Sequence, residues 1–136
     1  MAAGVTAVAV AVGGGWWWES TPRYDVPVPS ASASPGDVVG AYMRALDAHD
    51  SGTARALSTS NHRTTAATWL ADTSGLQVLG VSAPIDEGSE VEVKVTFDLH
   101  QHWWTDDPSM GPGRHAWGYR LVRQQGRWLI QDEGMG

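Results

Sequence analysis

Three polar side chains stand at alternate positions in the second half of the chain, in the pattern Asp98-x-His100-x-His102. Alternate residues of a β-strand project from one face, so two imidazoles and a carboxylate at this spacing could share one metal ion. The same face would carry Glu92 and Lys94, which is typical of a solvent-facing side. We interpret the three residues as a solvated strand face or a homodimer contact. Metal binding is the weaker alternative, and no cofactor is expected.

The other residues with catalytic chemistry have no suitable partners in the sequence. No Ser or Cys stands at a recognisable spacing from the remaining histidines, which are His49, His62 and His115. Residues 13–15 are all Gly but lack the Lys and the helix that a phosphate-binding loop needs. The chain contains no Cys, which excludes a thiolate metal site and a disulfide scaffold. No catalytic residue is therefore assigned.

The chain is short and acidic. It has 136 residues, 15 acids and 9 bases, and its formal net charge is −6. This length allows one domain. The negative charge argues against a nucleic-acid binder, which needs a basic face. The composition also includes eight Trp but a single Phe.

Helices are predicted in the first half of the domain. Residues 34–37 place Ser at the N-cap, Pro at the first helical position and an acid at the third. The apolar residues that follow have helical spacing: Val39, Tyr42, Met43 and Leu46. A second short helix is predicted over 53–57. A third should begin at a cap at 60–61 and bury three apolar residues, which are Ala66, Trp69 and Leu70.

From Leu76 onward the pattern alternates, which predicts strands at 76–82, 91–100, 115–123 and 127–132. The second of these strands is the clearest, with its apolar residues on one face: Val91, Val93, Val95, Phe97 and Leu99. Helices followed by antiparallel strands indicate an α+β domain. We expect N-terminal helices packed on a curved antiparallel sheet of about four strands.

The N-terminal region differs in composition from this domain. Residues 1–18 contain no charge and end in three consecutive Trp, which favours a signal or membrane-anchor segment. No Lys or Arg precedes the apolar stretch, so an export role requires a start further upstream. Residues 19–33 are rich in Pro, Ser and Ala and are predicted to be a linker. The folded domain then covers 34–136. This layout predicts a bacterial extracytoplasmic protein, either membrane-anchored through 1–18 or secreted.

Two stretches of sequence resemble a known family. The helix that opens Ser-Pro-Gly-Asp-Val-Val and the short Ala-Arg-Ala-Leu helix after it are similar to those of the nuclear-transport-factor-like superfamily, which includes the SnoaL-like proteins. Residues 126–132 resemble its last strand. The resemblance covers 34–133 and implies a cystatin-like cone of helices on a curved sheet. The Ala/Gly/Arg-rich composition with a single Lys also resembles small exported actinobacterial proteins.

The resemblance also implies where a site would lie. The isomerase-like members place a carboxyl base inside the cone, whereas the inward face of strand 91–99 is wholly apolar here. Tyr42 and Tyr119 could face inward with Asp132 near the mouth, a set that suits binding of a carbonyl or enolate. The remaining candidates for the pocket are tryptophans, namely Trp69, Trp103, Trp117 and Trp128. Strand parity places Trp104 outward, as a surface contact.

Two functions follow from these observations. The first is a non-catalytic extracytoplasmic domain that binds a protein partner or a small apolar ligand through its cone or its sheet face. The alternative is a SnoaL-like isomerase, cyclase or dehydratase that acts inside the cone. A pocket with Tyr42, Tyr119 or Asp132 at its base would favour the enzyme. A cone filled by Trp side chains would favour the binding domain.

Overall fold

The computed structural model describes residues 22–102 and 111–135. Three helices come first in this part of the chain: α2 (Pro35–Ala48), α3 (Ser51–Ala56) and α4 (Arg63–Asp72). The strands follow: β1 (Thr73–Val81), β2 (Ile85–Asp86), β3 (Glu90–Gln101), β4 (Gly113–Gln124) and β5 (Arg127–Met135). The antiparallel sheet has the order β1-β3-β4-β5, and the short β2 also pairs with β3.

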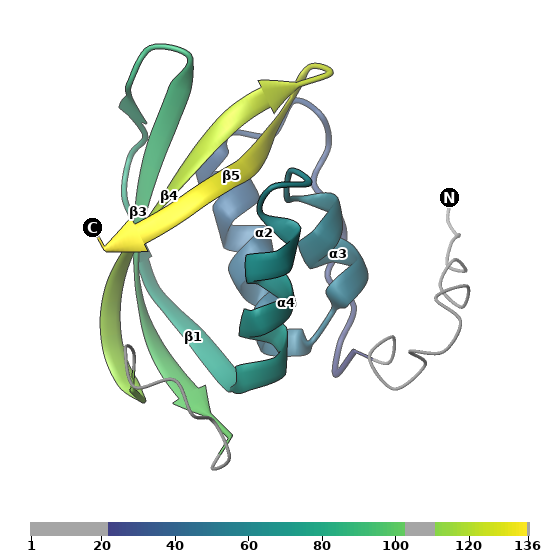
Figure 1. Cartoon of the computed structure of the whole chain (residues 1–136), viewed down its shortest axis with the longest axis vertical. Coiled ribbons are helices and arrows are strands. Elements are labelled where there is room, and N and C mark those ends of the chain that lie inside the picture. Colours follow the sequence, from purple (N-terminus) through teal and green to yellow (C-terminus); the bar gives the residue numbers. More distant parts are fainter. Residues whose placement is uncertain (1–21, 103–110, 136) are drawn as a thin grey trace.

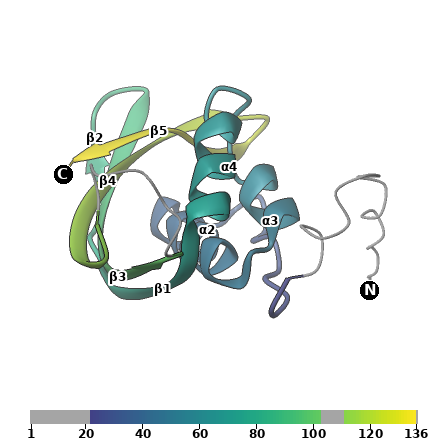
Figure 2. The ribbon, with the colours of Figure 1, turned by 60° about the horizontal axis from the view of Figure 1, so that its bottom comes forward.

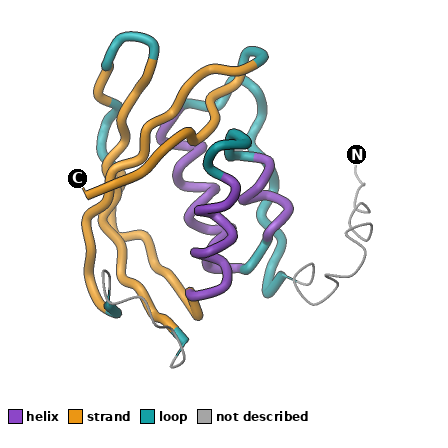
Figure 3. Tube along the Cα trace, in the orientation of Figure 1, coloured by secondary structure: helices purple, strands orange, loops and turns teal. Residues whose placement is uncertain are grey.

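The helices lie together on one face of the sheet (Figure 1, Figure 3). A second view separates the two layers clearly (Figure 2). The predicted α+β architecture is therefore confirmed. The described sheet has five strands where about four were expected, because two residues after β1 form the additional short pairing of β2 with β3.

Helix α2 begins as its sequence predicts. The side-chain oxygen of Ser34 accepts a hydrogen bond from the backbone N–H of Asp37 at 3.1 Å, and Pro35 is the first helical residue. The helix ends at Ala48, and the C-cap residue His49 has a left-handed φ of 59°. Its predicted apolar stripe is completely buried: Val39, Tyr42, Met43 and Leu46 are each 0% exposed. This stripe belongs to the same core cluster as the inner face of β3, where the alternate residues from Val91 to Leu99 are also buried.

Several boundaries differ from the prediction, and β5, for example, continues to Met135 instead of ending at 132. Helix α4 begins at Arg63, and its N-cap residue His62 makes no side-chain capping bond, whereas the sequence favoured a cap at 60–61. His62 is turned inward instead and is 2% exposed. Strand β1 follows α4 directly, since Thr73 already has extended backbone angles and pairs with Gln101 of β3. The strand predicted at 76–82 therefore begins three residues earlier, at Thr73.

The segment predicted as a solvated linker packs against the domain. Residues 22–33 contain no helix or strand, as their prolines require, yet Val26 is only 4% exposed and belongs to the core. The N–H of Val26 donates to Asp50 at 3.1 Å, and its carbonyl accepts from the hydroxyl of Thr53 at 2.5 Å. The backbone N–H of Arg23 donates to the carbonyl of Ala48 at 2.7 Å. The folded unit therefore begins before Ser34.

Several predictions fall on residues 1–21 and 103–110, which lie outside the described residues. These are the signal or anchor segment 1–18 and the pair Trp103 and Trp104. Among the residues that the structure does describe, no helix is both long enough and apolar enough to cross a membrane.

Candidate functional site

Four polar side chains meet between the helices and the sheet. Tyr42 comes from α2, His62 from the N-cap of α4, Tyr119 from β4 and Glu133 from β5. Both tyrosines are 0% exposed, His62 is 2% exposed, and the side chain of Glu133 is 9% exposed. Buried polar groups of this kind need partners, so the hydrogen bonds within the cluster decide what it can do.

His62 and two indoles surround the carboxyl group of Glu133. His62 Nε2 forms a hydrogen bond with the hydroxyl of Tyr42 at 3.0 Å and lies 3.3 Å from Glu133 Oε1. Glu133 Oε2 accepts from Trp69 Nε1 at 2.7 Å and from Trp117 Nε1 at 2.9 Å. The carboxyl is therefore held by donors from α4 on one side and β4 on the other.

A β-bulge explains why this glutamate faces the interior. On the inner face Ile130 lies opposite Leu121, and Glu133 lies opposite Tyr119. The residues on β5 are three apart whereas those on β4 are two apart, because Gln131 is an extra residue in β5. The bulge reverses the alternation of the strand. An unbroken strand would turn Glu133 to the solvent side.

Burial sets the charge states of the cluster. It raises the pKa of Glu133, an effect that the two indole hydrogen bonds oppose and that nearby Asp132 reinforces. Burial lowers the pKa of His62 to about 4, despite the opposing effect of the Asp132 charge. Burial, with the charge of Glu133, holds the pKa of Tyr42 and Tyr119 well above the usual value. At neutral pH His62 is therefore uncharged, and its contact with Glu133 is not an ion pair.

Two oxygens of the cluster have no hydrogen-bond partner among the described residues. They are the hydroxyl of Tyr119 and Oε1 of Glu133, which makes no hydrogen bond in spite of its contact with His62. Tyr119 and Glu133 are cross-strand neighbours on the inner face. Each buried polar group without a partner costs about 1–3 kcal/mol of folding free energy. Two such groups lie on neighbouring residues here, so a molecule that forms hydrogen bonds with both would be stabilised at this place.

The structure brings together four of the residues that the sequence singled out: Tyr42, Trp69, Trp117 and Tyr119. The two indoles are half-buried and pack edge to face, with ring centroids 6.5 Å apart. Trp69 makes a similar contact with Phe97 at 6.0 Å. The apolar wall of the cluster is thus formed by α4, β3 and β4.

Two other candidates lie away from the cluster. Asp132 was expected near the mouth of the site, but its side chain is 54% exposed and pairs with Arg120 at 2.9 Å. The bulge before it turns it to the outer face of the sheet. Trp128 is partly buried near the β4–β5 turn, where the guanidinium of Arg123 lies 4.7 Å from its ring centroid.

Sequence reasoning missed the two ionisable members of the cluster, His62 and Glu133. His62 carries a weak signal, since a lone His at a helix start can be turned inward when it does not cap the helix. Glu133 carries none, because its orientation depends on a bulge that no turn residue or Gly marks in the sequence.

The side chains of Asp98, His100 and His102, predicted to share one strand face, do not converge on one point. His100 Nε2 lies 3.8 Å from Asp98 Oδ2, and both side chains are exposed. The ring of His102 instead lies near His49, with centroids 6.2 Å apart. Within residues 22–102 and 111–135, no three His, Asp or Glu side chains come close enough to hold a metal ion.

The fold is similar to that of a solved protein. The solution structure of a SEC-C motif-containing protein from Rhodopseudomonas palustris matches with a TM-score of 0.55 and 18% sequence identity, over 79% of this chain and 82% of that chain. At this identity the likeness shows the fold alone. Searches of family models and of curated proteins give no match.

Proposed function

We propose that this chain is a non-catalytic, ligand-binding domain of the nuclear-transport-factor-like superfamily, with its site at the interior cluster. Helices on one face of an antiparallel sheet support a cone of this type. The position of the cluster, between helices and sheet, is where such a cone would hold a ligand. The expected ligand is small and mainly apolar, with one hydroxyl group.

The observation that carries this proposal is the pair of unpartnered oxygens on Tyr119 and Glu133. A ligand hydroxyl can donate to Oε1 of Glu133 and accept from the hydroxyl of Tyr119, which satisfies both at once. Phe97, Trp69 and Trp117 then supply apolar contacts for the rest of the molecule. The two indoles are the half-buried members, so the ligand enters by displacing their rings.

The proposal is tested by NMR titration with single-ring alcohols, each paired with the hydrocarbon that lacks the hydroxyl, such as cyclohexanol and methylcyclohexane. The alcohols should shift the Tyr119 and Glu133 resonances and bind about tenfold more tightly than the hydrocarbons. Tyr119→Phe and Glu133→Gln should remove this preference, while the surface variant Val28→Ala keeps it. Absence of binding, or an unchanged preference in both variants, would refute the proposal.

One observation favours catalysis as a second candidate. His62 Nε2 lies between the hydroxyl of Tyr42 and the carboxyl of Glu133, so an uncharged imidazole and a carboxyl of raised pKa stand within proton-transfer distance. This suits a SnoaL-like isomerase or dehydratase, with Glu133 as base. Exchange of the α-protons of a cyclic β,γ-unsaturated ketone in D₂O would detect it. The exchange should disappear in Glu133→Gln but persist in Asp132→Asn, and no exchange above the buffer rate would reject the enzyme.

The extracytoplasmic location is also a proposal, and it rests on the uncharged sequence of residues 1–18. Fractionation of the native protein tests it. Recovery in the membrane or outside the cell is expected, and a wholly cytosolic pool would refute it.

A further inference from the structure

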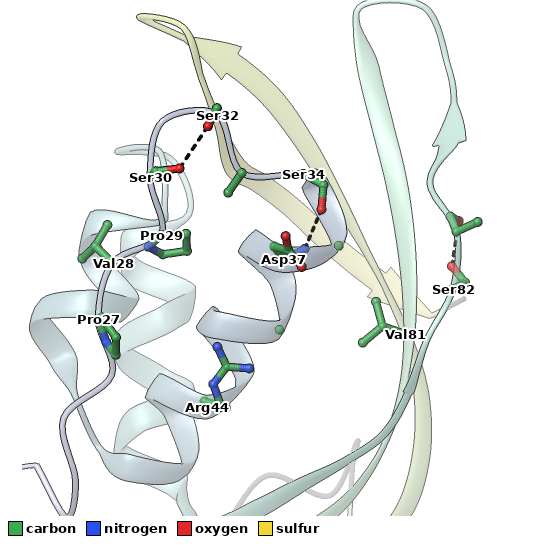
Figure 4. A pocket seen from close by; sticks show the side chains of 14 residues that line it. Pro27, Val28, Pro29, Ser30, Ser32, Ser34, Asp37, Arg44, Val81 and Ser82 are labelled. Atoms are coloured by element: carbon green, nitrogen blue, oxygen red, sulfur yellow. Dashed lines mark hydrogen bonds between the residues drawn. The ribbon is translucent and has the colours of Figure 1, made fainter.

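A groove lies on the surface far from the interior cluster, between α2 and the edge strand β1. Its larger part has a volume of about 1050 Å³ and is bordered by residues 27–34, the exposed side of α2 and the end of β1 (Figure 4). A smaller part of about 350 Å³ continues it and shares Gly40, Arg44 and Val81. Because the two parts share these residues, we treat them as one groove, the α2–β1 groove.

Three of the five large exposed hydrophobic side chains of the described residues line this groove. Tyr24, Val28 and Val81 line it, at 43%, 43% and 41% exposure. Leu79 and Ile85, at 45% and 44% exposure, continue the same border of the sheet along β1 and β2. Monomeric proteins seldom leave such side chains together without an interaction to cover them.

The backbone of β1 offers hydrogen bonds to the groove. Among the strands that the structure describes, β1 pairs with β3 alone and has no strand on its other side. On its other side, the N–H of Leu76 donates to Asp47 of α2 at 2.8 Å, which shows that this edge faces the helix. The N–H of Val78 points to the same side by strand alternation. An open edge beside a groove is the arrangement that accepts an added extended strand.

Arg44 is the basic side chain of the groove lining. It is exposed at the junction of the two parts, between residues 27–34 and Val81 (Figure 4). Within the described residues its guanidinium makes no ion pair. Asp47 is already engaged by Arg23, Tyr24 and the N–H of Leu76.

Asp37, the other acid of the groove, lies in the first turn of α2, where the helix N-terminus stabilises its charge. Of the charged side chains that line the groove, Arg44 is therefore the one that has neither an ion pair nor a helix N-terminus beside it within the described residues. A single carboxylate complements it.

We propose that the α2–β1 groove binds an extended peptide segment of a partner protein, with an acidic side chain that pairs with Arg44. The segment adds a strand to the free edge of β1 beyond Leu76, and its apolar side chains cover Val28 and Val81. This site is independent of the interior cluster and of the function proposed for it.

The test uses the full chain, labelled with ¹⁵N, and three acetylated ten-residue peptides of alternating Val and Thr with a central Glu, Gln or Lys. The Glu peptide should shift the amide signals of Val78–Val81 and bind about tenfold more tightly than the Lys peptide. Arg44→Glu should reverse this order and Arg44→Gln should abolish it. The matched surface variant Arg55→Glu, on α3, should leave it unchanged.

Three results would overturn the proposal. The first is the absence of amide shifts in β1 with any of the peptides. The second is a Glu preference that survives in Arg44→Glu. The third is self-association of the chain that Arg44→Glu disrupts, since the groove would then be occupied by a second copy.

Discussion

The indole N–H of Trp69 donates to the carboxyl of Glu133 at 2.7 Å, across 64 residues of sequence. This bond connects α4 to β5, and Trp117 donates to the same oxygen from β4. One carboxyl thus joins the helical layer to the sheet. Burying this acid costs desolvation free energy. Substitutions that remove the buried polar groups should therefore raise the stability of the fold and weaken the binding of a ligand.

Glu133→Gln should raise the free energy of unfolding at pH 7. The amide keeps an acceptor oxygen for both indoles but carries no charge to desolvate. The gain should shrink as the pH falls and the wild-type carboxyl becomes protonated, because burial raises its pKa. Urea titrations at pH 7 and pH 5 measure this. Glu133→Ala is the matched control and should lose about 2–4 kcal/mol, since it removes the acceptor and leaves a cavity.

Tyr119→Phe should stabilise the protein by about 1 kcal/mol, because it removes a buried hydroxyl that has no partner. The expected rise in the thermal midpoint is measured by calorimetry. Tyr42→Phe is the comparison, and it should destabilise the protein because its hydroxyl bonds to His62 at 3.0 Å. A loss of stability in both variants would mean that the hydroxyl of Tyr119 is satisfied in solution.

His62 should make the protein acid-sensitive. Its pKa falls from 6.5 to about 4 in the folded state, so burial of the neutral ring contributes stability above pH 6.5 that is lost as the pH falls through 4. The full loss from this group is about 3 kcal/mol. Glu133 acts in the opposite sense, since its raised pKa favours the folded state as the carboxyl takes up a proton.

Urea titrations from pH 7 to pH 4 should therefore show a shallower decline for His62→Gln than for the wild type. The decline for Glu133→Gln should be steeper. An identical pH dependence in the wild type and His62→Gln would contradict the assignment of this slope to His62.

Asp47→Ala should release residues 22–33 from the domain. Asp47 accepts from the hydroxyl of Tyr24 at 2.6 Å and from the N–H of Leu76 at 2.8 Å, and it lies 3.6 Å from the guanidinium of Arg23. Faster tryptic cleavage after Arg23 is the expected result, followed by mass spectrometry. Asp37→Ala, at the start of the same helix, should leave the cleavage rate at Arg23 unchanged. Equal rates in the wild type and Asp47→Ala would mean that other contacts hold the segment.

The parts of the fold that sequence predicts well are those set by local patterns. The capping signal at Ser34 and the alternation from Val91 to Leu99 each involve only neighbouring residues, and both are found in the structure. The linker predicted from composition is packed in its part at 22–33, because proline excludes regular structure but does not prevent a residue such as Val26 from joining the core. The interior cluster was only half predicted, since the orientation of Glu133 depends on pairing between strands.

The bulge at Gln131 also matters when this strand is compared with that of a related chain. Deleting that one residue would restore regular alternation and leave the pairing on both sides in place, so that Asp132 would still lie opposite Arg120 and Glu133 would still face Tyr119. The interior would therefore keep the same carboxyl. In this strand the extra residue is thus an insertion that moves the interior acid one place along the sequence without changing the acid itself. A gapless alignment of this chain with relatives that lack the extra residue would pair their interior acid with Asp132 rather than Glu133.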